Sequence, residues 1–199
     1  MMRFAINGFG RVGRTLLRVY RTREDVQARF ELAAINEIAD ANTVAHLARY
    51  DSNYGRYPGS IALSGSLLAI DQSLVPLSHE ADVAALPWAE LGIDLVFECT
   101  GAFTDRATAE QHLQSGAKRV LFSHPAESDV DATIVYGVNT EILSGDMNVV
   151  SAASCTTNAV VPVLATLSET FGLEAATITT IHSLMNDQPV LDAYHHTDL

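Results

Sequence analysis

Residues 3–37 place one glycine-rich turn between two apolar segments, and this arrangement constrains the fold more than any other feature of the chain. Residues 3–7 and 32–36 are predicted strands, a predicted helix follows the turn, and Glu37 ends the second strand. Strand, glycine turn, helix, strand and acid, in that order, are typical of a dinucleotide-binding βαβ unit. We therefore predict an α/β protein with a Rossmann-type, doubly wound parallel sheet. The turn consists of Gly8, Phe9, Gly10, Arg11, Val12 and Gly13.

Each glycine of the turn has its own physical role. Gly8 permits the tight turn, Gly10 lets the backbone approach a pyrophosphate, and Gly13 allows the helix to pack closely on the strand. The helix N-terminus then offers its N–H groups to an anion. All six residues of the turn are therefore predicted to bind the cofactor, with Arg11 directed at it, although an arginine on a helix face is usually solvated.

Glu37 decides which dinucleotide we expect. A single carboxylate at a strand end is commonly just solvated. Placed where an adenosine ribose would lie, it would accept hydrogen bonds from the 2′- and 3′-hydroxyls and repel a 2′-phosphate. No arginine follows in residues 38–40 to accommodate such a phosphate. The sequence therefore predicts NAD, and not NADP, as the cofactor.

The α/β pattern continues beyond this unit. The first helix should bury one face formed by Val12, Leu16, Val19 and Tyr20, and a left-handed Gly116 should end the helix at 105–115. Further helices are expected at 40–50 and 155–171, and strands at 61–63, 67–70, 75–77, 94–100, 119–123, 133–136, 148–151 and 177–181.

Strand ends locate the ligand crevice. In an open parallel sheet the ligand binds beyond the carboxyl ends of the strands. Thr100, Gly101 and Ser123 follow or end two such strands, so we predict that they contact the cofactor. Cys155 comes just after another strand end, and the thiol should share the same crevice.

Composition excludes several classes of function. The chain has 199 residues, 48% of them hydrophobic, which suffices for a sizeable core. Its net charge of −12 argues against nucleic acids and anionic membranes, both of which need a basic face. No run of eighteen apolar residues suggests a membrane span. The N-terminus enters a strand without an apolar leader, so we expect a cytoplasmic protein with unpaired Cys99 and Cys155.

Cys155 is the candidate nucleophile and His182 its candidate base. A helix N-terminus stabilises a thiolate, the reactive form of cysteine, and a nearby histidine is the usual activating group. Taken alone, such a cysteine is more often a small buried hydrophobe, and a lone histidine is more often structural. The polar run from Ser154 to Asn158 and the upstream dinucleotide crevice favour catalysis. His195 and His196 lack further ligands at tetrahedral spacing, so we predict no metal site.

Four segments together resemble the glyceraldehyde-3-phosphate dehydrogenase superfamily, and the resemblance covers the whole chain. The most specific is Ser-Cys-Thr-Thr-Asn with a histidine at position 182. The resemblance implies that Ser154 and Thr156 contact the acyl group or its acceptor, although helix capping explains them equally well. It also implies a homotetramer. The segments are 5–14, 99–101, 151–158 and 179–183.

Within the superfamily, several details resemble the D-erythrose-4-phosphate dehydrogenase branch. Asn36-Glu37 replaces the usual Asn-Asp, and segments 122–125 and 135–139 look like that branch. Asp187 lies where the glycolytic enzymes have phosphate-binding threonines, and its charge suggests an altered substrate pocket.

The resemblance implies a reaction. Cys155 would attack the aldehyde of erythrose 4-phosphate, a small phosphorylated aldose, and His182 would take the hydroxyl proton while hydride passes to NAD. Water would then hydrolyse the thioester to 4-phosphoerythronate, on a route to pyridoxal phosphate. In the alternative, phosphorylating glyceraldehyde-3-phosphate dehydrogenases, inorganic phosphate attacks instead.

The resemblance also divides the chain. Residues 1–153 would form the NAD-binding domain, and 154–199 the truncated start of an α+β catalytic domain. A truncated catalytic domain leaves a second hypothesis open, namely a non-catalytic NAD-binding remnant.

Overall fold

A nine-stranded, mostly parallel sheet organises the part of the chain that the computed structural model describes, residues 1–182. The strand order is β3-β4-β5-β2-β1-β6-β7-β9-β8, and only the β3–β4 and β4–β5 pairs are antiparallel. The strands are β1 (Met2–Asn7), β2 (Phe30–Asn36), β3 (Ile61–Ser64), β4 (Leu67–Ile70), β5 (Ser73–Ser78), β6 (Leu95–Glu98), β7 (Arg119–Phe122), β8 (Ala132–Thr133) and β9 (Val149–Ser151).

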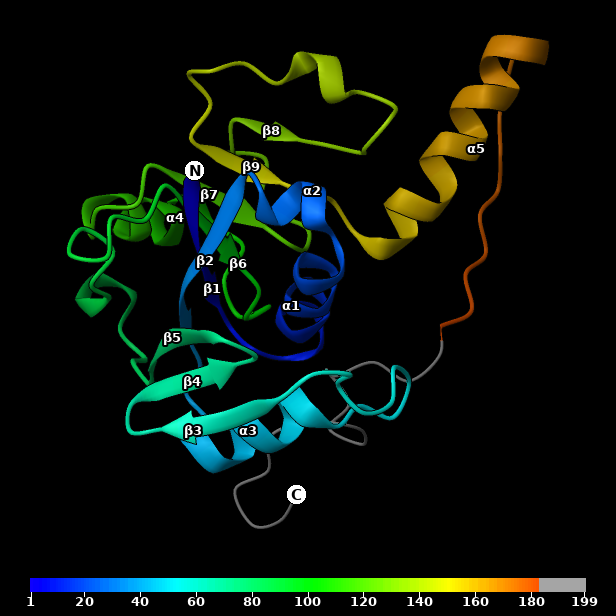
Figure 1. Ribbon diagram of the computed structural model, residues 1–199. Coiled ribbons are helices and arrows are strands. Elements are labelled where there is room, and N and C mark those ends of the chain that lie inside the picture. Colours follow the sequence, from blue (N-terminus) through cyan, green and yellow to red (C-terminus); the bar gives the residue numbers. More distant parts are fainter. Residues whose placement is uncertain (183–199) are drawn as a thin grey trace.

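Helices cover both faces of this sheet, which confirms the doubly wound α/β architecture (Figure 1). Phe4 and Ile6 of β1 pack with residues of α1 and α3, whereas Ala5 between them packs on the other face, with Trp88 and Val96. The helices are α1 (Arg11–Thr22), α2 (Glu24–Gln27), α3 (Ala41–Arg49), α4 (Arg106–Gln114) and α5 (Cys155–Phe171), with 3-10 turns η1 (Val83–Ala85) and η2 (Thr140–Ile142).

The predicted inner face of α1 is confirmed at Tyr20, which is buried, and in part at Leu16, which packs against the core, but it is wrong at Val12 and Val19. Val12 and Val19 are 49% and 47% exposed, while Leu17 and Tyr20 are buried in the core. Gly13 explains the rotation, because a Cβ there would lie 2.3 Å from a backbone oxygen of the turn. The helix touches the strand at Gly13, and the positions four and seven residues later therefore point inward.

Two predicted strands are also corrected. The strand expected at 133–136 stops at Thr133. Oδ1 of Asn139 accepts a hydrogen bond from the N–H of Val135 at 2.7 Å, so this N–H does not pair with a strand and the chain turns away. Residues 177–181 form no strand and are exposed. A strand needs a neighbour to accept and donate its ladder bonds, and this segment pairs with none of the nine strands of the described sheet.

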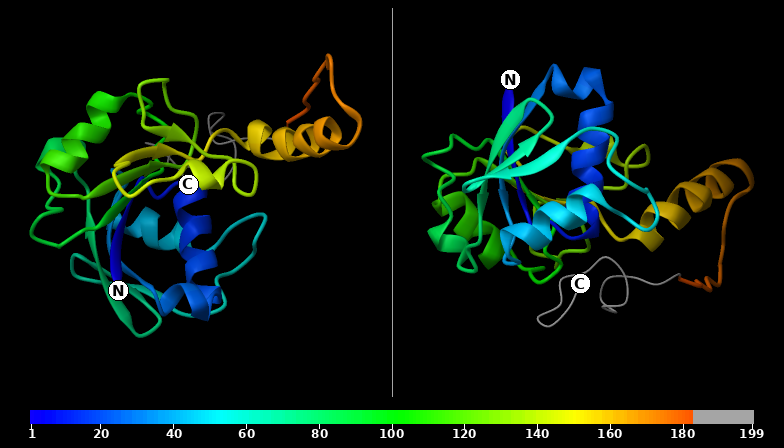
Figure 2. Two further views of the ribbon diagram at one scale, coloured as in Figure 1. Left: turned by 90° about the horizontal axis from the view of Figure 1, so that it is seen from above. Right: turned by 60° about the horizontal axis from the view of Figure 1, so that its bottom comes forward.

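α5 differs from every other long helix. It begins at Cys155, ends before Gly172 with φ +73°, and projects away from the sheet (Figures 1 and 2). None of its seventeen residues is buried.

Among residues 1–182, no helix combines the length and apolar character needed to cross a membrane.

Candidate cofactor cleft and active site

A cleft opens at the carboxyl ends of β1, β2 and β6, where sequence analysis expects the cofactor. Gly8, Gly10, Glu37 and Thr100, four of the residues predicted to bind the cofactor, line it. Cys99 lines it as well, but burial raises the pKa of this thiol to about 12, so it stays protonated near neutral pH. The cleft wall therefore supplies hydrogen-bonding groups and apolar contacts, and no reactive thiol.

The glycine turn has the geometry that an anion site requires. Gly8 has φ +88°, and a Cβ there would lie 2.5 Å from the backbone nitrogen of Thr100, so only glycine fits. A Cβ on Gly10, by contrast, would meet nothing within 4 Å. Gly10 is the N-cap of α1 and offers no side chain to cap it. The open approach and the helix N-terminus together fit the pyrophosphate of a dinucleotide.

Glu37 closes the turn from the end of β2. Its Oε2 accepts a hydrogen bond from the backbone N–H of Phe9 at 2.6 Å, and its Oε1 accepts one from Ala39 at 3.2 Å. The carboxylate is thus fixed at the rim of the cleft. This fixed position fits a residue that accepts hydrogen bonds from ribose hydroxyls, because the orientation of the carboxylate is set before the ligand binds.

The side chains of the remaining turn residues point elsewhere. Phe9 is buried in the core, and Val12 is half exposed. Arg11 pairs with Asp51 at 3.2 Å, and the side chain of Asp51 is only 3% exposed. Burial would raise the pKa of Asp51, but hydrogen bonds from two backbone N–H groups and the Arg11 charge hold it below its usual value. The structure therefore directs the Arg11 guanidinium at Asp51.

Gly101 and Ser123 were predicted beside Thr100. Gly101 has φ +70° and is exposed at the start of the loop that follows Thr100. Ser123 directly follows β7 and is half-buried; its N–H donates to the Glu98 carbonyl at 3.0 Å, and Ser123 is not among the residues that line the cleft. The structure thus brings Gly8, Gly10, Glu37 and Thr100 together at the cleft, while Ser123 lies outside its lining.

Cys155 is the first residue of α5 and is exposed. Ser154 caps the helix, and its Oγ accepts from the N–H of Thr157 at 2.9 Å. The preceding Ala153 has φ +60°, a left-handed conformation that a residue with a side chain rarely adopts. Such strain recurs at functional sites, and here it redirects the chain from β9 into the helix.

The chain brings His182 back to the first turn of α5 without forming the predicted strand. Nε2 of His182 lies 3.2 Å from Oγ1 of Thr156, the residue next to Cys155. Within residues 1–182, the imidazole of His182 is thus hydrogen-bonded to Thr156 and not to the Cys155 sulfur. Asn186, Asp187, His195 and His196 lie outside the described residues. Within residues 1–182 no cluster of three metal-binding side chains occurs.

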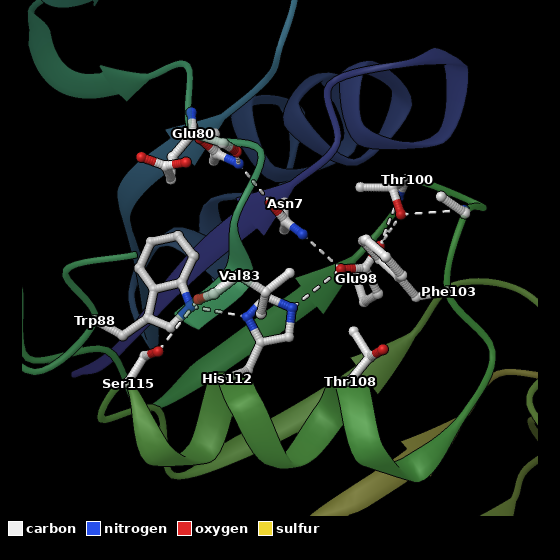
Figure 3. Close-up of polar contacts among 12 residues, drawn as sticks. Asn7, Glu80, Val83, Trp88, Glu98, Thr100, Phe103, Thr108, His112 and Ser115 are labelled. Atoms are coloured by element: carbon white, nitrogen blue, oxygen red, sulfur yellow. Dashed lines mark hydrogen bonds and ion pairs between the residues drawn. The ribbon is translucent and has the colours of Figure 1, made fainter. Parts of the chain in front are cut away.

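A buried polar cluster, which was not predicted from the sequence, extends from the lining of the cleft at Asn7 into the core. Asn7, Glu98, His112 and Trp88 are almost wholly inaccessible to solvent and are joined by hydrogen bonds (Figure 3). One signal was available: Asn7 and Glu98 are polar residues that end apolar strands, as does Asn36. Their partners, His112 on α4 and Trp88 in the loop after η1, give no comparable signal in the sequence.

Comparison with protein families agrees with this geometry. Residues 2–106 match the family model described as glyceraldehyde 3-phosphate dehydrogenase, NAD binding domain. Residues 154–199 match the model described as glyceraldehyde 3-phosphate dehydrogenase, C-terminal domain. The first match alone covers more than half of the chain and includes the glycine turn, Glu37 and Thr100. The chain therefore belongs to the glyceraldehyde 3-phosphate dehydrogenase family of NAD-dependent dehydrogenases, and NAD is its cofactor.

Proposed function

We propose that this chain carries the cofactor cleft and the nucleophile of an NAD-dependent dehydrogenase that oxidises D-erythrose 4-phosphate to 4-phosphoerythronate. One observation carries the chemistry: an exposed Cys155 begins α5, and His182 is hydrogen-bonded to the adjacent Thr156. A thiol at a helix N-terminus, with a histidine bonded to the neighbouring residue, supports nucleophilic catalysis on an aldehyde.

The chemistry follows from these two side chains. The Cys155 sulfur, as thiolate, forms a bond to the aldehyde carbon, and the carbonyl oxygen takes a proton to give a thiohemiacetal. His182 then accepts the hydroxyl proton as a C–H hydride leaves, and a thioester remains. A water molecule attacks the thioester carbon, the C–S bond breaks, and 4-phosphoerythronate departs with the thiol restored.

NAD, when bound, supplies the hydride acceptor for this reaction. The glycine turn and the start of α1 would hold its pyrophosphate, and Glu37 would accept the ribose hydroxyls. The Glu37 carboxylate is already oriented by hydrogen bonds from the N–H groups of Phe9 and Ala39. Ser154 and Thr156 would serve the acyl group, while the cap that Ser154 already provides keeps the N-terminal turn of α5 intact.

The choice of substrate depends on sequence details. Asn36-Glu37, segments 122–125 and 135–139, and Asp187 support the erythrose branch of the family. An acid near a phosphate-acceptor site disfavours inorganic phosphate and so favours water as the acyl acceptor. The alternative is a phosphorylating glyceraldehyde-3-phosphate dehydrogenase, which requires inorganic phosphate for turnover.

The proposal extends to organisation. We assign residues 1–153 to the NAD-binding domain and 154–199 to the catalytic domain, and the match of residue 154 onward to the C-terminal family model supports that boundary. A homotetramer in the cytoplasm is the assembly and location we expect from the family.

The test is NADH formation by the 199-residue chain with each of two aldehydes. Erythrose 4-phosphate should give NADH without added phosphate, and Cys155→Ala should not. A signal only from glyceraldehyde 3-phosphate with inorganic phosphate would overturn the substrate assignment. Folded chain that binds NAD but oxidises neither aldehyde would overturn the catalytic proposal and favour a non-catalytic NAD-binding protein.

A further inference from the structure

A row of polar side chains crosses the sheet at the carboxyl ends of four strands. Ser78, Asn36, Asn7 and Glu98 are the last residues of β5, β2, β1 and β6, and the strand register places them side by side. Asn36, Asn7 and Glu98 are 4%, 2% and 0% exposed. Buried polar groups at this depth are costly unless each has a partner, so their hydrogen bonds indicate what the row does.

Glu98 anchors the row. One oxygen, Oε2, accepts from Nδ2 of Asn7 at 2.6 Å and from Nε2 of His112 at 3.1 Å. The other, Oε1, accepts from the Thr100 N–H at 2.8 Å and from the Thr100 hydroxyl. Burial would raise the pKa of Glu98, but the bonds from His112, Thr100 and Asn7 outweigh it, and the pKa lies below its usual value. The carboxylate is therefore ionised and can only accept.

Trp88 fixes the tautomer of His112. An indole N–H only donates, and Nε1 of Trp88 lies 2.9 Å from Nδ1 of His112. Nδ1 must therefore accept, and Nε2 carries the hydrogen that it donates to Glu98. Both rings are 0% exposed. A switch of tautomer would leave two N–H groups facing each other in the core.

The ionised carboxylate also sets the direction of the amides in the row. Because Nδ2 of Asn7 points at Glu98, its Oδ1 accepts from Nδ2 of Asn36 at 2.8 Å. Oδ1 of Asn36 then accepts from the Glu80 N–H at 2.9 Å and from the Ser78 hydroxyl at 2.8 Å. Nδ2 of Asn36 also donates to the Glu80 carbonyl at 2.9 Å. The backbone of Glu80 is thus held through both of its polar groups.

The two ends of this chain of bonds are two walls of the cofactor cleft. Glu80 and Thr100 both line the cleft, and they lie on two sides of Asn7 (Figure 3). The Thr100 hydroxyl also accepts from the Ala102 N–H at 3.2 Å, and Ala102 lines the cleft too. Glu98 itself lies beneath, without contact with the open cleft.

We propose that Glu98 is a positioning residue that holds both walls of the NAD cleft in register, with His112, in the tautomer fixed by Trp88, as its brace. The proposal rests on the cofactor cleft assigned above. Glu98 acts through Thr100 on one wall and through Asn7 and Asn36 on the other.

Glu98→Gln tests this role with an isosteric change. Whichever way the new amide is turned, its NH₂ faces a group that now donates, either Thr100 or His112. An unsatisfied buried donor weakens the arrangement enough that we expect about tenfold weaker NAD binding by isothermal titration calorimetry of the full chain. Unchanged affinity in the folded variant would overturn the proposal.

Asp131→Asn is the matched control. Asp131 is also a multiply bonded carboxylate, which accepts from Arg106 and from the N–H groups of Asn148 and Val149, away from the cleft. We expect this variant to unfold at lower urea concentration yet to bind NAD like the wild type. An equal loss of affinity in both variants would show that Glu98 acts only through general stability.

A second variant tests the brace. In Glu98→Gln combined with Trp88→Phe, Nδ1 of His112 no longer faces an indole N–H, so the hydrogen can move there and Nε2 can accept from the new amide. The double variant should bind NAD more tightly than Glu98→Gln alone. Equal or weaker binding would contradict the role of Trp88.

Hydrogen exchange covers the case in which Glu98→Gln does not fold. In the wild-type chain without NAD, the amides of Glu80, Thr100 and Ala102 should be protected, because the Glu98 network holds all three. Fast exchange at these amides would overturn the proposal. A wild-type chain that does not bind NAD would instead overturn the cofactor cleft itself.

Discussion

The sheet unit, residues 1–153, and the arm, residues 154–182, hold their functional groups in opposite ways. In the sheet unit, Glu37 accepts a bond from Phe9, and Thr100 donates to Glu98, whose other oxygen accepts from Asn7 and His112 of other elements. Both lie above a core that includes Trp88 and Phe122 with 0% exposure. In the arm, Cys155 is positioned by its neighbours in sequence, and α5 buries none of its residues. The cofactor cleft therefore depends on long-range packing, whereas the proposed nucleophile, Cys155, depends on a helix cap and a strained junction.

The largest expected effect separates the two regions by function. Cys155→Ala should lower turnover by at least about 1000-fold, because no other group would replace the proposed nucleophile. NAD affinity should stay unchanged, since Cys155 is exposed and outside the cleft wall. Turnover is followed as NADH formation, and affinity by calorimetry. The control is Cys99→Ala, which removes the buried thiol and should keep most of the turnover. If Cys99→Ala abolished turnover instead, Cys155 would not be the nucleophile.

The second prediction compares one aromatic residue from each region. Phe122→Ala should cost about 3–5 kcal/mol of unfolding free energy, because the side chain is fully buried. Phe171→Ala, at 80% exposure, should change it by less than about 0.5 kcal/mol. Urea unfolding of both variants measures the difference. Similar losses would mean that α5 packs on the rest of the chain in solution.

The third prediction concerns the glycine turn. Gly13→Ala should weaken NAD binding and lower the free energy of unfolding by about 1–3 kcal/mol. The new Cβ would lie 2.3 Å from the Gly8 oxygen, so the start of α1 must move. Gly145→Ala is the control, because a Cβ there meets nothing within 4 Å. If both substitutions left NAD affinity intact, close packing of α1 would not be needed for the anion site.

The smallest effect distinguishes the caps of the two regions by pH. In the sheet unit Asp40 caps α3, and hydrogen bonds from the side chain and backbone of Thr43 hold its pKa below the usual value. A lowered folded-state pKa gives stability that is present above the unfolded pKa and lost as pH falls through the folded one. The Ser154 hydroxyl that caps α5 does not titrate in this range. Acid should therefore loosen the start of α3 before that of α5.

Asp40→Asn tests this pH effect, because asparagine also caps helices but carries no charge. The variant should differ from the wild type by less than about 1 kcal/mol at neutral pH and should lose that part of the acid dependence. Amide signals of α3 and α5 followed by NMR from pH 7 to pH 3 measure both. Identical acid profiles for the variant and wild type would rule out Asp40 as the source.

Local patterns predicted most of the elements. The glycine turn, the hairpin at 61–70 and the bounds of α5 were all readable, because each depends on residues close in sequence. The errors share one cause. The inner face of α1, the end of β8 and the absent strand at 177–181 depend on what packs or pairs beside them, which no local pattern contains.

The sequence by itself determined the βαβ unit with its glycine turn, an acid, Glu37, after its second strand, and a cysteine at the start of a helix. Only the tertiary structure decided that Arg11 faces Asp51, that Ser123 lies outside the lining of the cleft, and that Glu98 accepts hydrogen bonds from Asn7, Thr100 and His112. The reason is physical. Turns, caps and strand ends follow from neighbouring residues, whereas the partners of a buried charge come from distant segments that meet only when the sheet has formed.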